Sequence, residues 1–439
     1  MKVAIIGSGI SGLSCAWMLS QRQPACEIKV FEANETLGGH TATLDVEISN
    51  RSYAIDTGFI VYNQKTYPRF IALLAQLGIT GQPTQMSFSV HNPDSRLEYN
   101  GHTLNTLFAQ RRNFFKPKFW RFLREILRFN ALCKQRVQQP GNDESTVSDL
   151  LRQNGFSAFF ALHYVLPMGA AIWSSSLEDM GKFPLSMFLR FFDNHGLLDV
   201  SHRPQWMVVP GGSREYIRRM QQLLPASVQL LTNTPVNSVI RREGSVTIQS
   251  TQGSETFDQV IFACHSDQAL AMLQAPTDAE RQVLCGLPYQ SNEVVLHTDI
   301  NQLPVSRRAW ASWNYRLPNG VESALGHTPS APVHSAIVRQ RRASVTYNMN
   351  ILQGIESENN FCVTLNPITP IDERKILFKT QYRHPVLNLA SYQSQQRRGE
   401  INGHNRSWFC GAYWHNGFHE DGVRSAEEVV NQLLEQESA

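Results

Sequence analysis

The stretch Lys2-Val3-Ala4-Ile5-Ile6-Gly7-Ser8-Gly9-Ile10-Ser11-Gly12 decides the fold of this chain. Its first five residues include β-branched side chains, which favour a strand. The pattern G-x-G-x-x-G follows, and residues 13–19 after it are helix-like. In this order Gly7 permits a tight turn, Gly9 lets the backbone approach a pyrophosphate, and Gly12 lets the helix lie close to the strand. The N-terminus of the helix then faces the phosphates with the positive end of its dipole.

A second strand and an acidic residue complete a dinucleotide-binding pattern. Pro24 ends the helix, residues 27–31 read as a strand, and Glu32 follows directly. A carboxylate about 20 residues after the last motif glycine accepts hydrogen bonds from the ribose hydroxyls, and it repels a ribose 2′-phosphate. The pattern therefore predicts a dinucleotide without that phosphate. The alternative is a turn between two core strands that binds nothing.

The composition of the chain limits the number of domains, the kinds of partner and the cellular compartment that can be expected. The chain has 439 residues, enough for two or three domains or one interleaved pair, and its net charge of +3 gives no reason to expect a nucleic-acid partner. The seven cysteines are scattered and form no C-x-x-C motif, which favours a reducing, cytoplasmic compartment over a disulfide framework. We expect no metal site, because no metal-ligand spacing occurs. The short apolar run at the N-terminus is unlike a signal peptide, and no stretch has the length of a transmembrane helix.

Further glycine-containing segments lead to a family resemblance. Gly38-Gly39 lets the backbone turn sharply or pass close to a ligand, and a hairpin over 44–56 delivers the loop Thr57-Gly58-Phe59-Ile60. With these segments the chain resembles the flavin-containing amine oxidoreductase superfamily, which includes amine oxidases, protoporphyrinogen oxidase and phytoene-desaturase-like enzymes. It also resembles a bacterial subgroup of FAD/NAD-binding proteins associated with fatty-acyl modification. Three later stretches are similar to the family's P-x-G-G turn, its adenine-side strands and its second flavin motif: 209–213, 234–264 and 408–423.

The resemblance implies an α/β fold in which a Rossmann-type FAD-binding domain is interleaved with a mixed α+β substrate domain. The FAD-binding domain is expected from residues 1–62, 206–285 and 401–439, and the substrate domain from 63–205 and 286–400. A helix starting near Glu420 is expected to direct its N-terminus at the flavin and to stabilise the reduced form. The residues expected to contact FAD are Gly7, Ser8, Gly9, Ile10, Ser11, Gly12, Glu32, Ala33, Gly38, Gly39, His40, Thr57, Gly58, Phe59, Ile60, Val236, Gly411, Ala412, His419, Glu420 and Val423.

The chain departs from the family pattern at four places. His40 stands where the family often has arginine, and Ala412 stands where it has an acid that anchors the flavin. The stretch 287–295 has no lysine, although many amine oxidases carry one near the flavin N5. Phe418 replaces the tyrosine of the aromatic cage. The last two departures argue against an ordinary amine oxidase.

Residues 111–130 are a candidate for contact with a membrane surface. Pro117 suits the first turn of a helix, and a basic amphipathic helix rich in Phe and Trp can lie on an anionic membrane surface. The alternative is a surface helix whose apolar face packs on the protein's own core. The expected apolar face holds Phe115, Phe119, Phe122, Leu123 and Ile126, and the expected opposite face holds Arg121, Arg124 and Arg128.

Three residues are expected in the substrate pocket: Trp173, His384 and Phe418. The small residues around Trp173, in 166–176, would line a pocket or pack helix on helix. His384 or His419 would act as a catalytic base or would bond backbone near the cofactor, and no catalytic residue is assigned.

The sequence therefore predicts an FAD-dependent oxidoreductase that removes a hydride from a carbon substrate. We expect desaturation or dehydrogenation of a small, apolar, lipid-like molecule by a cytoplasmic protein, with peripheral membrane contact through 111–130. Two alternatives stay open: an amine oxidase with an altered aromatic cage, and a flavin-binding protein without redox turnover.

Overall fold

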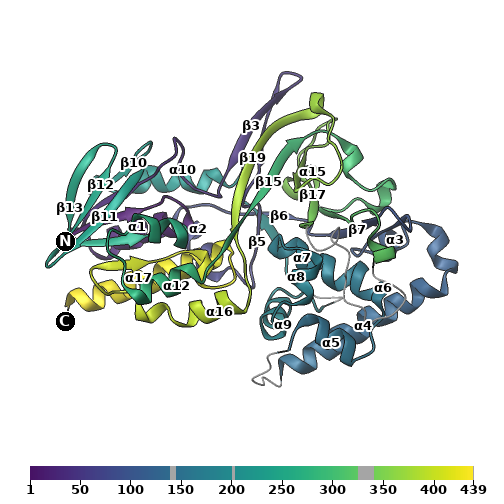
Figure 1. Cartoon of the computed structure of the whole chain (residues 1–439). Helices are drawn as coiled ribbons and strands as arrows, with labels where there is room; N and C mark the ends of the chain where they lie inside the picture. Colours follow the sequence, from purple (N-terminus) through teal and green to yellow (C-terminus); the bar gives the residue numbers. More distant parts are fainter. Residues whose placement is uncertain (139–144, 200–202, 325–340, 439) are drawn as a thin grey trace.

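The computed structural model describes residues 1–138, 145–199, 203–324 and 341–438. Figure 1 shows two lobes: the first holds both ends of the described chain, and the second holds the green strands and the blue helices. No helix of the described residues is long and apolar enough to cross a membrane.

A five-stranded parallel sheet forms the centre of the first lobe, in the order β10-β2-β1-β14-β20. The strands come from segments far apart in the sequence, and β1 lies in the middle of the sheet, between β2 and β14. Four of the five residues of β1 are buried, as expected for a parallel strand that is covered on both faces. The predicted strands at 2–6 and 27–31 are confirmed. The bounds are β1 (Lys2–Ile6), β2 (Glu27–Phe31), β10 (Val228–Leu231), β14 (Gln259–Phe262) and β20 (Ser407–Phe409).

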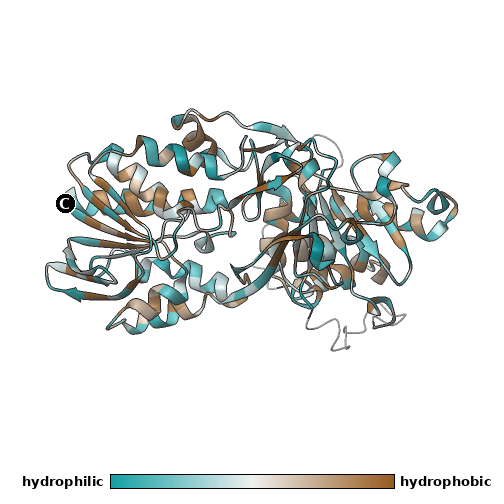
Figure 2. Ribbon diagram, turned by 90° about the horizontal axis from the view of Figure 1, so that it is seen from above, coloured by the Kyte–Doolittle hydropathy of each residue, from teal (hydrophilic) through white to brown (hydrophobic). Residues whose placement is uncertain are grey.

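Helices and a smaller sheet cover the parallel sheet. Figure 2 shows hydrophobic and hydrophilic residues alternating along these helices, which is the pattern of helices with one buried face. The predicted hairpin over 44–56 accompanies them as the two-stranded sheet β3-β4. The elements are α1 (Ile10–Arg22), β3 (Thr43–Ile48), β4 (Arg51–Asp56), α10 (Arg214–Leu223), β11 (Val236–Arg242), β12 (Ser245–Ser250), β13 (Gly253–Phe257), α11 (Ser266–Met272), α12 (Asp278–Cys285), α16 (Leu389–Gln396) and α17 (His419–Ser438).

A seven-stranded sheet forms the frame of the second lobe, in the order β19-β15-β18-β17-β16-β7-β8. Its neighbours are antiparallel except for β16 and β7. The long strands β15 and β19 run together from the second lobe toward the first (Figure 1). The bounds are β7 (Phe88–Asn92), β8 (Leu97–Asn100), β15 (Tyr289–His297), β16 (Trp313–Arg316), β17 (Ser344–Asn348), β18 (Cys362–Leu365) and β19 (Ile376–Pro385).

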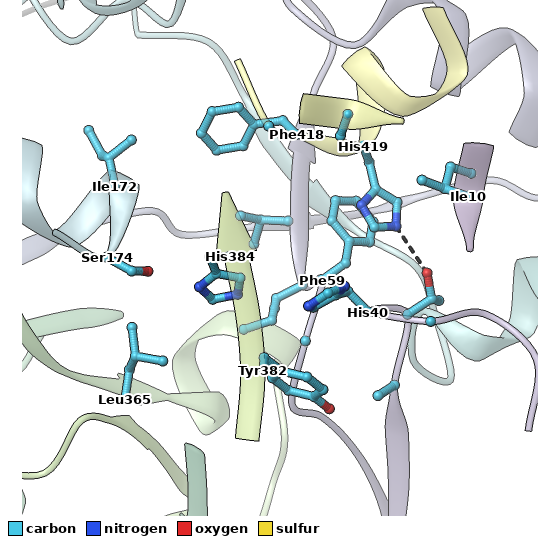
Figure 3. A pocket seen from close by; sticks show the side chains of 18 of the residues that line it. Ile10, His40, Phe59, Ile172, Ser174, Leu365, Tyr382, His384, Phe418 and His419 are labelled. Atoms are coloured by element: carbon cyan, nitrogen blue, oxygen red, sulfur yellow. Dashed lines mark hydrogen bonds between the residues drawn. The ribbon is translucent and has the colours of Figure 1, made fainter. Parts of the chain in front are cut away.

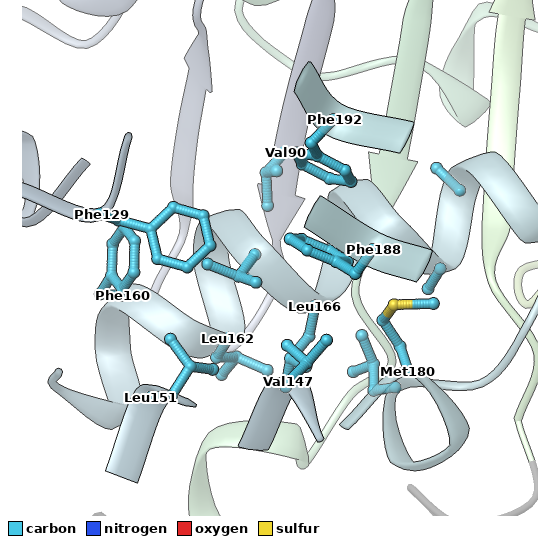
Figure 4. Packing of buried hydrophobic residues seen from close by; sticks show 14 of the residues in the cluster. Val90, Phe129, Val147, Leu151, Phe160, Leu162, Leu166, Met180, Phe188 and Phe192 are labelled. Carbon is cyan, nitrogen blue, oxygen red and sulfur yellow. The ribbon is translucent and has the colours of Figure 1, made fainter. Parts of the chain in front are cut away.

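Helices between β8 and β9 pack around an aromatic core. Figure 4 shows Phe129, Phe160 and Phe188 from three helices meeting at its centre. The elements are α3 (Leu104–Leu107), α4 (Pro117–Val137), α5 (Val147–Gln153), α6 (Ala158–Phe160), the π-helical segment η2 (Ala161–Val165), α7 (Leu166–Trp173), α8 (Leu177–Gly181) and α9 (Leu185–Asn194). The remaining short elements are β5 (Val61–Asn63), α2 (Pro68–Gln76), β6 (Gln82–Thr84), β9 (Trp206–Val208), α13 (Val321–Ala324) and α15 (Met349–Gln353).

The predicted helix after Pro117 exists, but its predicted apolar face is wrong in part. Phe119 and Phe122 belong to the aromatic core and are 2% and 0% exposed. Phe115 precedes the helix and is 84% exposed, and Trp120 and Leu127 are 43% and 58% exposed on α4. The helix carries two apolar sides, because bulky residues at 119, 122 and 129 face the core while those at 120 and 127 face outward.

Candidate active site

One cavity of about 2100 Å³ connects the two lobes. At its first-lobe end it is lined by the turn after β1, at the carboxyl edge of the parallel sheet, where dinucleotides bind in folds of this kind. At its other end it is lined by side chains of α4, α7 and β18.

The glycine turn has room for a ligand on one side only. A Cβ added to Gly12 would lie 2.0 Å from the Gly7 carbonyl oxygen, so Gly12 lets α1 sit against the turn. A Cβ added to Gly9 would meet no heavy atom within 4 Å beyond its chain neighbours, so Gly9 faces the open cavity. Backbone N–H groups at the start of α1 also lie at this point, which suits a diphosphate.

The Gly38-Gly39 segment lies directly beside this turn. The Gly38 N–H donates to the Ser8 carbonyl at 3.1 Å, and Gly38 pairs with Gly9 in a short parallel bridge. Both glycines have positive φ angles, +113° and +58°, which L side chains rarely adopt. This conformation places His40 on the wall of the cavity.

Glu32 ends β2 with its carboxylate on the cavity wall. Oε2 accepts hydrogen bonds from the Ser8 N–H at 3.1 Å and the Ser8 hydroxyl at 2.5 Å, and Oε1 accepts from the Asn34 N–H at 2.9 Å. The side-chain Nδ2 of Asn34 also donates to Oε1, at 2.8 Å, so the roughly four acceptor sites of the carboxylate are all in use, and ribose hydroxyls would bind it in place of the Ser8 hydroxyl or the Asn34 side chain.

The first turn of α17 approaches the first turn of α1. A Cβ on Gly422 would lie 2.7 Å from the Ile10 side chain, so the two helix N-termini meet only because residue 422 is a glycine. Both helices direct the positive ends of their dipoles toward this region, which favours a negatively charged group. His419, the first residue of α17, lines the cavity.

Most of the predicted FAD residues line the cavity, and three do not. Gly12 is covered by the turn, and Val423 is 1% exposed in the core of the first lobe. The Glu420 carboxylate accepts hydrogen bonds from the N–H groups of Arg69 and Phe70, so it caps α2 instead of facing the cavity. The side chains of Trp173, His384 and Phe418 line the cavity as well.

The residues present fit FAD. The glycine turn would hold the diphosphate, Glu32 would hold a ribose, and the segments at Gly38 to His40 and at Gly411-Ala412 would border the flavin ring. Several buried polar atoms of cavity-lining side chains, among them His40 Nε2, His265 Nδ1 and the Tyr413 hydroxyl, have no hydrogen-bond partner in the described protein. Such atoms are rare unless a ligand or water satisfies them.

Four aromatic side chains, which we call the ring cluster, meet at the middle of the cavity: His40, His265, Tyr382 and His384. The centroids of the other three rings lie 5.9, 5.1 and 5.5 Å from that of His40, respectively. Figure 3 shows His40, Tyr382 and His384 of this cluster. Burial, together with the neighbouring imidazoles, lowers the pKa of His384 to about 3 and that of His265 to about 4. The cluster is therefore uncharged near neutral pH, which disfavours His384 as a base that picks up a proton there.

Beyond the ring cluster the cavity continues as an apolar space, which we call the chamber. Ile172 and Leu365 face it in Figure 3, and Ser174 closes α7 with a left-handed backbone, φ +53°. Phe418 stacks on Phe191 at 5.1 Å between ring centroids. Further chamber residues are Met86, Phe88, Leu107, Trp120, Leu123, Arg124, Ile126, Leu127, Tyr164, Met168, Trp173 and His195. Among the described residues, the carboxylates that line the cavity are Glu32 and Glu35, both at the glycine-turn end.

Several of these residues lie outside the motifs read in the sequence. His265 lies three residues after the end of β14. Tyr382 lies two residues before His384 on β19, so it shares the cavity-facing side of that strand with a residue that the sequence did identify. His195 and Arg124 gave no such signal. Their approach to the cavity depends on how the helices of the second lobe pack.

The chain is similar to proteins of known family and structure. The family model described as flavin-containing amine oxidoreductase matches residues 10–322. No curated protein sequence matches significantly. Among solved structures, a CLA-producing fatty acid isomerase from P. acnes is 13% identical over 98% of both chains, with a TM-score of 0.68. A cyclohexylamine oxidase from Brevibacterium oxydans is 14% identical over 100% of this chain and 99% of the other, with a TM-score of 0.66.

At such identities the two structures establish the fold alone. The family model covers well over half of the chain, and the matched residues include Glu32 and the Gly38-Gly39 pair, which line the cavity. This chain therefore belongs to the flavin-containing amine oxidoreductase family, and it is an FAD-dependent oxidoreductase.

Proposed function

We propose that this oxidoreductase removes a hydride from a carbon atom of an apolar, lipid-like small molecule, in a desaturation or dehydrogenation. The chamber carries the proposal, because its walls are mainly aliphatic and aromatic side chains, with Arg124 the charged side chain among the chamber residues named above, and the cavity's carboxylates lie at the far end. An ammonium group in the chamber would meet no carboxylate of the described residues, and burying an unpaired charge is costly.

The residues of this chain would divide the work between the two ends of the cavity. FAD, when bound, supplies the hydride acceptor. Residues in 1–62, 206–285 and 401–439 would hold it, with the glycine turn on the diphosphate and Glu32 on a ribose. Residues in 63–205 and 286–400 would form the chamber, which orients the chain of the substrate and excludes water from the reacting carbon.

We also propose that the protein contacts an anionic membrane surface through 111–130. Phe115 is 84% exposed, and Trp120 and Leu127 are exposed on α4 and also line the cavity. Basic residues surround them at Arg111, Arg112, Lys116, Lys118, Arg121 and Arg124. Exposed aromatic side chains with surrounding cations are typical of proteins that lie on anionic lipid.

An amine oxidase with an altered aromatic cage is the second candidate. The observation in its favour is an aromatic wall of the chamber. It consists of Phe418, Phe191 and His195, whose ring centroids all lie within 5.8 Å of one another. Such a wall would accept a neutral amine by apolar contact.

Anaerobic reduction of the bound flavin separates the two candidates. We expect bleaching of the flavin absorbance by a medium-chain acyl compound and none by cyclohexylamine or putrescine. Ile172→Arg should slow this bleaching by narrowing the chamber and placing a charge in it, whereas Leu389→Arg, on the exposed surface of α16, should not. Bleaching by amines alone would replace the proposal with amine oxidation. No bleaching by either class would favour a flavin-binding protein without redox turnover.

A further inference from the structure

A chain of hydrogen bonds runs from the backbone of the second lobe to the ring cluster through two asparagines, Asn366 and Asn292. It ends at His384, whose ring lies between Ser174 and His40 among the lining side chains (Figure 3). The direction of each hydrogen bond in this chain decides which nitrogen of His384 carries the proton.

The side-chain amide of Asn366 is oriented by two backbone groups. Its Oδ1 accepts from the Glu293 N–H at 3.2 Å, and its Nδ2 donates to the Ala343 carbonyl at 3.3 Å. An N–H can only donate and a carbonyl can only accept, so the reversed orientation would lose both hydrogen bonds. The remaining N–H of this amide donates to Asn292 Oδ1 at 2.9 Å.

The orientation of Asn292 follows from that of Asn366. Because its Oδ1 accepts from Asn366, its Nδ2 lies on the other side, 3.0 Å from His384 Nδ1 and 3.5 Å from the Gln290 carbonyl. Asn292 is 0% exposed, so no water competes for these positions. His384 Nδ1 must therefore accept, and the single proton of the neutral imidazole resides on Nε2.

We infer that His384 is a fixed hydrogen-bond donor, whose Nε2–H binds a lone-pair acceptor atom of the molecule in the cavity, such as a carbonyl or carboxylate oxygen. No other described residue forms a hydrogen bond with Nε2. Asn292 and Asn366 are positioning residues, since they act only through His384. The inference concerns the direction of a hydrogen bond between protein and ligand, so it goes beyond the proposed substrate class. A ligand that presents only N–H donors to His384 should bind poorly.

Charge in the surroundings supports the same direction. Burial lowers the pKa of His384, and the titratable groups that face it, His40 and His265, lower it as well. A proton on Nδ1 would have to displace the Asn292 amide as well. The neutral Nε2–H form is therefore the form expected at neutral pH.

The test is ¹⁵N NMR of histidine-labelled, FAD-loaded protein, with His384 assigned through the loss of its signals in His384→Gln. In the wild-type protein we expect Nδ1 unprotonated and Nε2 protonated from about pH 6 to about pH 9. In Asn292→Asp the nearly isosteric carboxylate still accepts from Asn366, but it now requires a proton on His384 Nδ1. Asn50→Asp, which adds the same charge at the exposed β3–β4 turn, should leave both signals unchanged.

Binding of two probes gives a second readout, followed by the visible spectrum of the bound FAD at about pH 8. Octanoate should bind more tightly than octylamine to the wild-type protein. Asn292→Asp should weaken octanoate by roughly tenfold or more, the usual value of a hydrogen bond to a charged group, and Asn50→Asp should not. A protonated Nδ1 in the wild-type protein, or an unprotonated Nδ1 in Asn292→Asp, would overturn the inference. Neither NMR result depends on turnover, so the inference about His384 would remain valid even if the proposed lipid substrate proved wrong.

Discussion

The imidazole of His419 lies 3.5 Å from the phenyl ring of Phe59, measured between ring centroids, with 11° between the two planes. Phe59 belongs to the loop after β4, and His419 begins α17. His419 Nε2 also lies 3.0 Å from Thr41 Oγ1. This contact ties the last helix to two loops of the cofactor site and buries an uncharged imidazole between them.

Acid should destabilise the protein through this histidine and others like it. Burial lowers the pKa of His419 to about 3, below its ordinary value of 6.5. As the pH falls below about 6.5, the unfolded chain binds the proton and the folded chain does not, so stability is lost progressively down to about pH 3. Each such group costs about 1.4 kcal/mol of unfolding free energy per pH unit. His195, His265, His297 and His384 act in the same direction.

Two buried carboxyl groups oppose this trend. Burial raises the pKa of Asp56 and of Asp421 to about 6, so protonation favours the folded state as the pH falls from about 6 toward 3.8. The histidines outnumber them, and we expect a net loss of stability between about pH 6.5 and pH 4. Urea unfolding across this range should show a shallower pH dependence in His419→Gln than in the wild-type protein, whereas exposed His102→Gln should keep the wild-type slope.

Alanine at two motif glycines should produce different failures. In Gly9→Ala the methyl group points into the open cavity, so the protein should fold normally and lose FAD. In Gly12→Ala the methyl group would meet the Gly7 carbonyl at 2.0 Å, so α1 must move and stability should fall by about 1–3 kcal/mol. Thermal unfolding of the FAD-free proteins separates the two cases. Equal destabilisation of both variants would contradict this interpretation of the turn.

Glu32→Gln should weaken FAD binding. The change removes the charge that strengthens hydrogen bonds from ribose hydroxyls, and such bonds contribute about 1.5–3 kcal/mol, or roughly 10- to 100-fold in affinity. The dissociation constant can be measured from the quenching of FAD fluorescence. Glu27→Gln, at the exposed start of the same strand, is the matched control. An unchanged affinity in Glu32→Gln would mean that the carboxylate forms hydrogen bonds with Ser8 and Asn34 only and does not contact FAD.

Membrane contact predicts that vesicle binding depends on outward side chains of 111–130. The double change Phe115→Ser and Trp120→Ser should reduce co-sedimentation with phosphatidylglycerol vesicles about tenfold or more, because two exposed aromatic rings no longer insert. High salt should reduce it further. Leu389→Ser, 55% exposed on the first lobe, should bind as the wild-type protein does. Equal co-sedimentation of all three proteins would remove the membrane proposal.

Local motifs predicted the first lobe well. The glycine turn, β1, β2 and the β3–β4 hairpin follow from neighbouring residues, because each depends on short-range rules of turn and strand chemistry. The side of α4 that faces the core could not be predicted from neighbouring residues in the sequence. Bulky residues occur on both of its sides, and only the packing of β8, α6 and η2 against Phe122 decides that this ring is inside and Trp120 outside.

The protonation state of His384 in the ring cluster could not be predicted from the sequence either. His384 was a candidate for its position, but its protonation state depends on Asn292, on the neighbouring strand, and on Asn366, which follows β18. These three residues come together through the pairing of β15 with β18 and β19. A hydrogen-bond direction set by backbone groups of other strands leaves no trace in a local motif.

The position of β20 in the parallel sheet has a consequence for synthesis. β20, at 407–409, pairs with β14, which pairs with β1 at the other end of the chain. During translation the parallel sheet therefore lacks its edge strand β20 and the covering helix α17 until nearly all the described residues have been made. Its unpaired strand edge is exposed in the meantime, which favours dependence on chaperones and slow acquisition of FAD.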